Sequence, residues 1–492
     1  MFNIRTFQIL LLVMPTFNMH VNAQNYDMVI ANGRVVDPET GLDGIRHLGI
    51  NAGTIKSIST KPLMGAKTVN AKGLVVAPGF IDIHSHTPTK LGQRMNLLDG
   101  VTTQLDMEAG AFPVSFFGQD YRGGAHLNYG ASVAHYAVRS KVMEGLNIEY
   151  IFGNTTDTFQ MDGKSWTTKA TKDQIEAMRV MINQGIDGGG LGIGVLLDYL
   201  TSAVSADELR MLFEVAGERQ VPIHVHLRRG YTGDPAGLID VINHAKETNA
   251  PLFVVHITHN AMGRVGEWLQ MIDAANQEGA NIATETLSYA AGGTSISADV
   301  FRHRDWQGMF DITYEDVQWI ATGEWLTKET WDKYAREQPR GSVNHHYVKE
   351  DWMKTALQWP RMMVATDALP AVDLSVKTNP NIAGTFSRVL GHYVRDTKLL
   401  TLSDGLARMS LYQAQWLSQA SDDFDKKGRI QQGADADIVI FDPTTVEANA
   451  VYGDPYQPPT GIPHVIVGGQ LVVSNGELIE GVYPGQRILE DR

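Results

Sequence analysis

A long middle stretch, about residues 80–425, most constrains the fold, because short apolar runs and helical segments alternate along it. The helical segments, such as residues 206–219 and 265–278, are rich in Glu, Lys and Ala. Repeated strand–helix units of this size favour a parallel sheet, either open or closed. We expect its strands at residues 79–83, 100–105, 191–197, 221–227, 252–258, 281–284 and 362–366.

Both ends of the chain read as β structure. Apolar runs flank Asn32-Gly33, which predicts a hairpin over residues 26–37, and residues 436–441, 465–467 and 471–473 continue this character. We therefore expect one small β-sandwich domain from residues 24–79 and 430–492, with two separate β units as the alternative. The barrel-like unit then spans residues 80–429. Its residues 300–360 hold six of the nine tryptophans and predict an insertion with helices of its own.

The first 23 residues are typical of a secretory signal peptide. Arg5 is followed by an apolar stretch, and Val21-Asn22-Ala23 offers small residues for cleavage after Ala23. A membrane anchor is the alternative, but a span needs about 20 apolar residues. We therefore expect a periplasmic or secreted protein.

The composition excludes several classes of function. The chain has no cysteine, which removes disulfides, thiol nucleophiles and thiolate metal sites. Its 41 basic and 55 acidic residues give a net charge of −14 without a basic patch, so neither nucleic acid nor a membrane is expected as a partner. Any metal must be held by carboxylates and by some of the 16 histidines.

Four expected strands end in side chains that can bind a metal. In a closed α/β barrel the carboxyl ends of the strands meet at one mouth, so these side chains should converge. Histidine and carboxylate suit zinc, and less often manganese, iron, cobalt or nickel. The alternative is that each histidine is a hydrogen-bonded, half-buried core residue. The groups are His84 and His86, His224 and His226, His256 and His259, and Asp367.

These residue types suggest metal-assisted hydrolysis of a C–N bond. Such a metal polarises a carbonyl and lowers the pKa of a bound water toward neutrality. A nearby aspartate can take the proton of that water and pass it to a leaving amine. The residues alone do not identify the bond.

Longer segments resemble a known family. Residues 78–86, Pro-Gly-Phe-Ile-Asp-Ile-His-Ser-His, resemble the first-strand signature of the amidohydrolase superfamily, and residues 427–442 resemble its return to the small β domain. Residues 255–259, 366–370 and 384–395 are similar to the D-aminoacylase group, the N-acyl-D-amino-acid deacylases. The resemblance implies a (β/α)₈ TIM-type barrel and a hydrolase with one or two divalent metals, with Zn²⁺ favoured.

The resemblance also implies a ligand set. Carried over by position, His84, His86 and Asp367 bind one metal, and His226 and His259 bind the other. In hydantoinase-like relatives the sixth-strand ligand falls nearer His256, but the longer match to the deacylase segment favours His259. His224 and His256 then become inward-facing neighbours or supporting partners of the ligands.

The ligand that bridges the two metals departs from the family. Relatives use a carboxylated lysine or a cysteine, yet this chain has no lysine between Lys172 and Lys246 and no cysteine. We predict that Glu108 bridges, with Asp106 on the same strand face as the fallback. Both acids could instead support other ligands through hydrogen bonds.

The sequence offers fewer candidates for substrate-binding residues than for metal ligands. Arg228 lies two residues past His226 and could bind a substrate carboxylate, while Arg229 should point to the surface. Tyr289 matches a family tyrosine that contacts substrate. Ala261 stands where the resemblance implies a lysine, and Asn379-Pro-Asn381 replaces a His-Pro-Arg segment. The insertion could form a lid, an oligomer contact or a separate apolar core.

We therefore expect hydrolysis of the amide bond of a small-molecule N-acyl-D-amino acid, or of a related amide, by metal-activated water with Asp367 as proton shuttle. A cyclic-amide hydrolase or a dipeptidase is the alternative within the superfamily. An inactive metal-containing binding protein is the alternative from another class, and an oligomer is possible.

Overall fold

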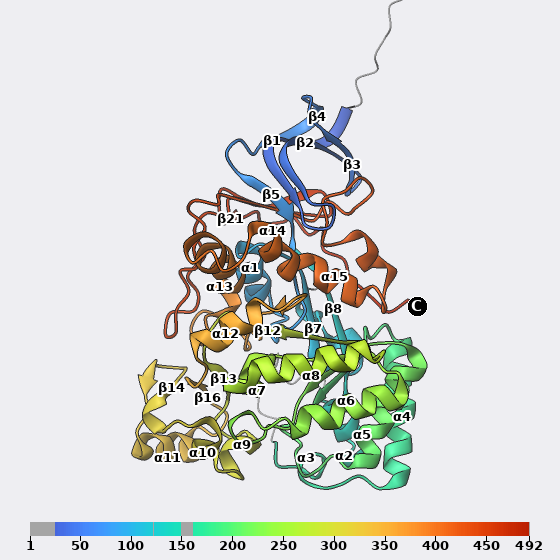
Figure 1. Ribbon diagram of the computed structural model, residues 1–492, viewed down its shortest axis with the longest axis vertical. Coiled ribbons are helices and arrows are strands. Elements are labelled where there is room, and N and C mark those ends of the chain that lie inside the picture. Colours follow the sequence, from blue (N-terminus) through green and yellow to red (C-terminus); the bar gives the residue numbers. More distant parts are fainter. Residues whose placement is uncertain (1–24, 122, 149–160, 492) are drawn as a thin grey trace, which may run out of the picture.

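The computed structural model describes residues 25–121, 123–148 and 161–491 (Figure 1). The expected signal peptide, residues 1–23, lies outside the described residues. A sheet domain forms one end of the molecule, and the barrel with its insertion forms the rest. No helix of the described residues is long and apolar enough to cross a membrane.

The barrel consists of eight parallel strands, and the fold class predicted from the sequence is confirmed. Its two outermost strands, β6 and β17, are tied together just past their ends. The backbone N–H of Asp367 donates to the carbonyl of His84 at 2.8 Å, and that of His86 donates to the carbonyl of Ala368 at 3.0 Å. In order, the strands are β17 (Met363–Val364), β12 (Ile282–Thr286), β11 (Leu252–Val254), β10 (Ile223–His226), β9 (Ile193–Leu196), β8 (Asn128–Ala134), β7 (Val101–Ala111) and β6 (Phe80–Asp82).

Strand β8 was missed in the sequence because its residues, NYGASVA, are small and only weakly apolar. Small residues suit this position, since a Cβ at Gly130 would lie 2.8 Å from a methyl of Leu191. Close packing around β8 therefore favours small side chains at such positions, and the strand lacks the run of large apolar residues that marks a buried strand.

Helices cover the outside of the barrel and bury their apolar faces against the strands. Helix α5 begins after Ser205, whose side chain accepts from the N–H of Glu208, and it buries Leu212 and Phe213. The helices of this layer are α1 (Lys90–Leu98), α2 (His135–Glu144), α3 (Lys164–Thr167), α4 (Lys172–Asp187), α5 (Ala206–Arg219), α6 (Ala236–Thr248), α7 (Ile257–Ala261), α8 (Val265–Gln277), α12 (Glu350–Leu357), α13 (Asn381–Arg388), α14 (Leu402–Leu406) and α15 (Tyr412–Leu417). Five short 3₁₀ helices of the described residues belong to the barrel: η1 (Val114–Phe116), η2 (Gln119–Tyr121), η3 (Tyr231–Gly233), η4 (Met262–Arg264) and η8 (Asp422–Lys426). The segments η6 (Val389–Asp396) and η7 (Ala407–Leu411) are π helices.

Strands from both chain ends form one nine-stranded sheet. Strand β18 pairs antiparallel with β5, which joins the C-terminal strands to the N-terminal ones. The strands are β1 (Asn25–Asp37), β2 (Leu42–Asn51), β3 (Thr54–Ser59), β4 (Met64–Asn70), β5 (Val75–Pro78), β18 (Ile438–Phe441), β19 (His464–Val467), β20 (Gln470–Ser474) and β21 (Glu477–Leu478).

The hairpin predicted at Asn32-Gly33 is wrong, because residues 25–37 form the single strand β1. Asn32 has a left-handed backbone, with φ of 64°, and the register of β1 against β2 shifts between Ile30 and Gly33. Asn-Gly therefore makes a bulge here instead of a turn.

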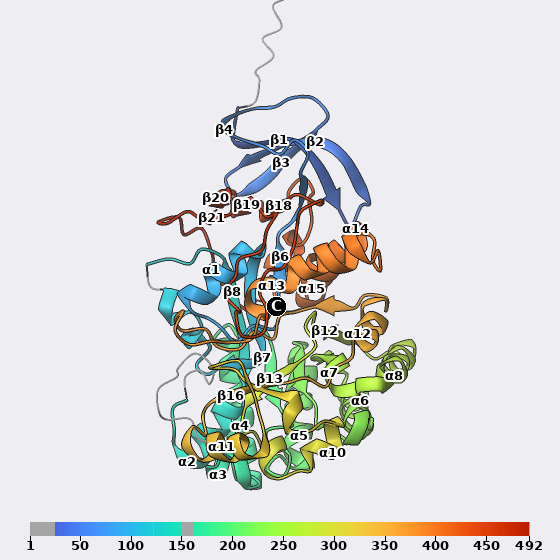
Figure 2. The same cartoon turned by 90° about the vertical axis from the view of Figure 1, so that its left-hand side faces the viewer.

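The insertion is a four-stranded antiparallel sheet with helices, and it lies at the opposite end of the barrel from β1–β5 (Figure 2). It begins at residue 292, earlier than predicted. Trp306 stacks on Trp331 with ring centroids 5.0 Å apart, so the insertion has an aromatic core of its own. Its elements are β13 (Gly292–Ser295), α9 (Asp299–Arg302), α10 (Trp306–Phe310), η5 (Tyr314–Asp316), β14 (Val317–Trp319), β15 (Glu324–Trp325), α11 (Lys328–Glu337) and β16 (Ser342–His345).

Candidate metal centre

The strand ends bring most of the sequence-predicted ligands into one buried cluster. Glu108 lies within the long strand β7, and His226 is the last residue of β10. The remaining members lie two to four residues beyond the ends of β6, β11 and β17. The cluster consists of His84, His86, Glu108, His226, His256 and Asp367.

One oxygen of Glu108 faces a pair of histidines. Its Oε2 lies 3.2 Å from Nε2 of His84 and 3.1 Å from Nε2 of His86, and the two nitrogens are 3.1 Å apart. Oδ1 of Asp367 lies 3.4 and 3.5 Å from the same two nitrogens. These four donor atoms form the first group.

The other oxygen of Glu108 faces a second pair. Its Oε1 lies 2.8 Å from Nδ1 of His226 and 3.1 Å from Nε2 of His256, and these nitrogens are 3.2 Å apart. Glu108 is therefore shared by two groups of donors, as predicted for a bridging ligand.

The donor spacing fits a tetrahedral metal in each group. Zinc lies about 2.0–2.2 Å from nitrogen and carboxylate ligands, so neighbouring donors of a tetrahedral site are about 3.4 Å apart. The separations within each histidine pair, and those between each pair and the carboxylates that face it, are 2.8–3.5 Å and approach that edge length. Every donor is an imidazole or a carboxylate, the set that suits a divalent ion.

Two further carboxylates orient the first histidine pair. Oε1 of Glu285, in β12, accepts from Nδ1–H of His84 at 2.5 Å, and Oδ2 of Asp106 accepts from Nδ1–H of His86 at 2.8 Å. In the neutral imidazole, each bond places the ring proton on Nδ1, so that Nε2, which faces Glu108, can bind a metal. Asp106, the fallback bridge, is thus a partner of His86.

The electrostatics keep the bridging carboxylate ionised. Burial alone would raise the pKa of Glu108, but His84 and His226 outweigh burial and hold that pKa well below its usual range. Burial and neighbouring His226 lower the pKa of His256 to about 4, so His256 is neutral at pH 7. A neutral imidazole is the form that binds a metal.

Two members of the cluster have strained backbones. His256 has φ of 33° and Asp367 has φ of 47°, in the left-handed region that non-glycine residues rarely adopt. The Asp367 backbone is held in place by the bond from its N–H to the carbonyl of His84. Such strain collects at functional sites, where the surrounding structure fixes it.

The preference for His259 over His256 is corrected by this geometry. Strand β11 ends at Val254, and His256 lies two residues beyond it, whereas His259 lies in the following helix α7. His259 reaches neither donor group, and its ring packs edge-on against Tyr347. His224 points into the core, where its ring stacks on Phe253.

The expectations for the two arginines are reversed. Arg228 turns away from the cluster, donating to Asp240 at 3.3 Å and to the carbonyl of Val204 at 2.8 Å. Arg229 instead lines the cavity beside the cluster. Strand β10 stops at His226, so the alternation of a strand does not extend to these residues.

Tyr289 does not line the cavity beside the donor groups either. Its hydroxyl donates to the carbonyl of Ala450 at 2.8 Å, and the guanidinium of Arg388 lies over its ring. Its place in the structure is a packing contact between the barrel and residues 450–452.

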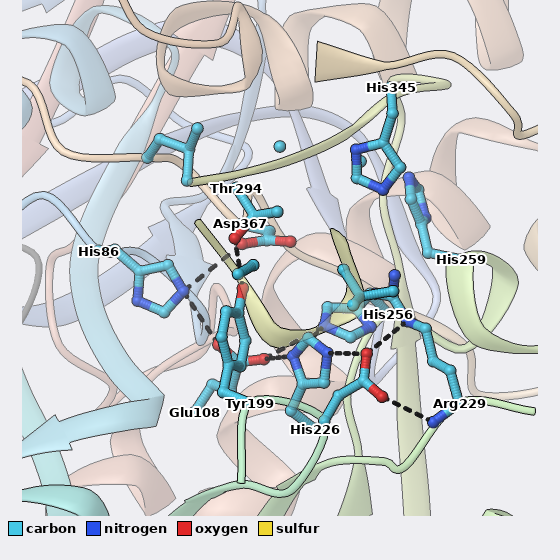
Figure 3. A pocket seen from close by; sticks show the side chains of 16 residues that line it. His86, Glu108, Tyr199, His226, Arg229, His256, His259, Thr294, His345 and Asp367 are labelled. Atoms are coloured by element: carbon cyan, nitrogen blue, oxygen red, sulfur yellow. Dashed lines mark hydrogen bonds and ion pairs between the residues drawn. The ribbon is translucent and has the colours of Figure 1, made fainter. Parts of the chain in front are cut away.

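A cavity of about 580 Å³, including its open mouth, lies over the donor groups (Figure 3). The insertion contributes Thr294, Val300 and His345 to its wall. Of the residues that the sequence analysis missed, Glu285 was signalled by its place at the end of an expected strand. His345 had no such signal, because no barrel strand precedes it. The wall is completed by Asp198, Tyr199, Arg229, His259, Gly292, Gly293, Ala298 and Leu369.

Comparison with known proteins agrees with this architecture. Residues 144–473 match the Amidohydrolase family. D-aminoacylase of Alcaligenes xylosoxydans xylosoxydans is 27% identical over 91% of this chain and 94% of its own length. N-acyl-D-glutamate deacylase of the same organism is 27% identical over 91% and 93%.

A solved structure of N-acyl-D-glutamate deacylase from Bordetella bronchiseptica, complexed with zinc and a phosphonate inhibitor, has a TM-score of 0.78. It is 24% identical and covers 95% of this chain and 100% of that chain, so it shares the fold. The family match covers well over half of the chain, and the resemblance seen in the sequence is confirmed. The chain belongs to the amidohydrolase family.

Proposed function

We propose that this chain hydrolyses the amide bond of an N-acyl-D-amino acid with two divalent ions, zinc favoured. Family membership makes the chain a hydrolase of carbon–nitrogen bonds other than peptide bonds. The observation that carries the proposal is the placement of Glu108, whose two oxygens each face a pair of imidazole nitrogens. The substrate class is supported by the deacylases that match nearly the whole chain.

The residues divide into two ligand sets. His84, His86, Glu108 and Asp367 would hold one ion, and Glu108, His226 and His256 would hold the other. When bound, a divalent metal supplies a Lewis acid for the amide carbonyl and lowers the pKa of water.

Asp367 is the group placed to move a proton. Burial alone would raise its pKa, but His84 and its other neighbours outweigh burial and lower it, so Asp367 starts as a base. Its side chain is 20% exposed to the cavity, the most open of the cluster's carboxylates. Asp367 would accept the proton of the attacking water and deliver it to the amine that leaves.

A substrate panel tests the proposal. N-acetyl and N-formyl amino acids, both enantiomers of each, are incubated with zinc-restored protein, and the released acid and amine are measured. We expect hydrolysis of D enantiomers that stops when a chelator removes the metal. No hydrolysis of any member, or hydrolysis that the chelator leaves unchanged, would contradict it.

A cyclic-amide substrate is the second candidate, because His256 occupies the position at which hydantoinase-like relatives were expected to place their ligand. The same panel therefore includes hydantoin and dihydrouracil. Ring opening faster than any deacylation would favour this candidate.

We also propose that the chain is exported and cleaved after Ala23. The leader pattern in residues 1–23 supports this. N-terminal sequencing of the protein from its native cells should begin at Gln24, and an intact Met1 would contradict the proposal.

A further inference from the structure

The cavity has a second polar region, which the donor groups do not use. It consists of Arg229, His259 and His345, which we call the Arg229 cluster. They come from the loop after β10, from α7 and from β16 of the insertion. In Figure 3 the rings of His259 and His345 both lie on the other side of the view from His86 and Glu108.

Both histidines of the Arg229 cluster are buried with incomplete hydrogen bonding. His259 and His345 are each only 2% exposed. The backbones of Ala291 and Gly292 lie beside their rings, but no ring nitrogen of either makes a hydrogen bond of ordinary length and angle among the described residues. Their rings are held by aromatic contacts instead, since His345 stacks on Tyr347 at 5.0 Å and packs against Phe310 at 5.0 Å. Buried polar atoms are almost always paired, so these nitrogens indicate a missing partner.

Arg229 is fixed by contacts that leave the end of its guanidinium available. Its side chain is 9% exposed, its Nε donates to Asn260 at 3.0 Å, and its backbone N–H donates to Asp198 at 2.9 Å. Within the described part of the chain, no hydrogen bond of its two Nη atoms is found. Nε of Arg229 also lies 3.7 Å from Oδ2 of Asp198, and Asp198 pairs with Arg304 at 2.5 Å as well, so one carboxylate faces two guanidinium groups.

The chemistry of this set matches a carboxylate. A guanidinium can donate two parallel N–H bonds to a carboxylate, whose oxygens accept about four bonds in all. Burial lowers the pKa of His259 to about 3 and the pKa of His345 well below its usual range, so both rings are neutral, each with one N–H to donate. The lysine and arginine that the family resemblance implied are Ala261 and Asn381 here, and neither can supply this charge.

We infer that Arg229, His259 and His345 bind the free carboxylate of the substrate while its amide lies at the donor groups. This inference rests on the proposed function and names the residues that select its substrate. The insertion thereby supplies part of the specificity through His345.

The first test compares an acid with its amide. KM and kcat are measured for the best N-acetyl-D-amino acid of the panel and for its C-terminal carboxamide, which lacks the charge. We expect Arg229→Met to raise KM for the acid roughly tenfold to a hundredfold, with the carboxamide little changed. Arg228→Met is the matched control, because Arg228 faces Asp240 and not the cavity. It should leave KM and kcat unchanged for both the acid and the carboxamide.

An equal rise in KM for both substrates, or no rise for either, would overturn the inference. Because Arg229 contacts Asn260, its loss could disturb the loop, so Arg229→Lys provides a second variant. Arg229→Lys keeps the positive charge, so it should recover part of the preference for the acid that Arg229→Met loses. If Arg229 acted only through its shape, Arg229→Lys would not recover this preference.

His345→Phe separates recognition from folding. No ring nitrogen of His345 makes a hydrogen bond of ordinary geometry among the described residues, and its surroundings are aromatic. The apolar ring should therefore keep or raise the Tm while weakening acid binding several-fold. Unchanged binding of the acid would overturn the role of His345.

Calorimetry with N-acetyl-D-alanine and N-acetyl-D-alaninamide on zinc-loaded protein distinguishes the two proposals. If the wild type hydrolyses nothing but binds the acid through Arg229, the proposed function fails and the inference stands. If it hydrolyses the acid and the carboxamide equally well, with or without Arg229, the inference fails and the proposed function stands.

Discussion

The two regions of the cavity differ in how their polar atoms are satisfied. In the donor groups, His84 and His86 point one nitrogen at Glu108 and are oriented by Glu285 and Asp106 through the other. In the Arg229 cluster, no ring nitrogen of His259 or His345 makes a hydrogen bond of ordinary geometry among the described residues, and among the fully buried ring nitrogens of the donor groups the same holds only for Nδ1 of His256. The chain itself therefore orients His84 and His86, whereas we infer that a bound carboxylate completes the Arg229 cluster.

The difference follows from the scaffold of each region. The donor groups lie at the ends of barrel strands, whose register is fixed by backbone hydrogen bonds on both sides. The Arg229 cluster lies on a loop, a short helix and the insertion. Chemistry on a rigid barrel and selectivity on its loops can therefore change independently.

Asp367→Asn should have the largest effect on turnover. The amide keeps the size of the side chain but cannot accept the proton, so kcat should fall by roughly 10²- to 10⁴-fold. Circular dichroism and Tm should match the wild type. Near-normal turnover of a substrate that the wild type cleaves would refute the role of Asp367.

A pair of histidine variants separates the regions. His256→Ala removes a donor from the second group and should lower the affinity for one of the two ions by at least about 100-fold. This effect is larger than the loss of metal affinity expected when an orienting partner is removed. His259→Ala should leave metal content unchanged and weaken acid binding. Metal titration of both variants decides the assignment, and metal loss in His259→Ala alone would restore the sequence-based choice.

Glu285→Gln should have an intermediate effect. It removes the charge that orients His84, and loss of such a partner typically weakens metal affinity roughly 10- to 100-fold. Competition with a chelator measures this change. An affinity equal to that of the wild type would show that Glu285 has no part in the centre.

Trp331→Ala should affect the Arg229 cluster alone. Trp331 is 7% exposed and stacks on Trp306 in the core of the insertion, so its loss should cost about 3 kcal/mol of local stability. The preference for acid over carboxamide should fall several-fold, with metal content intact. Parallel loss of bound metal would mean that the two regions are not independent.

The sequence predicted the barrel and most of its centre because both rest on local patterns. Strands such as 252–254 read as apolar runs, and His84, His226 and Asp367 lie at or just beyond strand ends. Strand β8 was not predicted because close packing favours small residues there, which do not form a recognisable apolar run. Asn32-Gly33 misled because a bulge and a hairpin turn share the same left-handed residue.

The Arg229 cluster could not be predicted in this way. Whether Arg228 or Arg229 faces the cavity depends on where β10 ends, and alternation from His226 gave the wrong one. His345 reaches the cavity only through the fold of the insertion, whose pairing of β13 with β16 is long-range. The choice between His256 and His259 depended on the left-handed backbone of His256 itself, which no sequence pattern marks.

The central claim is that Glu108 joins two metal sites. Plasma mass spectrometry of zinc-saturated, dialysed protein should find two ions per chain in the wild type, one for each donor group. Glu108→Gln leaves the second group with only His226 and His256, and it should retain one ion at most, with Asp106→Asn as a control that retains both at saturating zinc. Two ions in the Glu108→Gln protein would contradict the account.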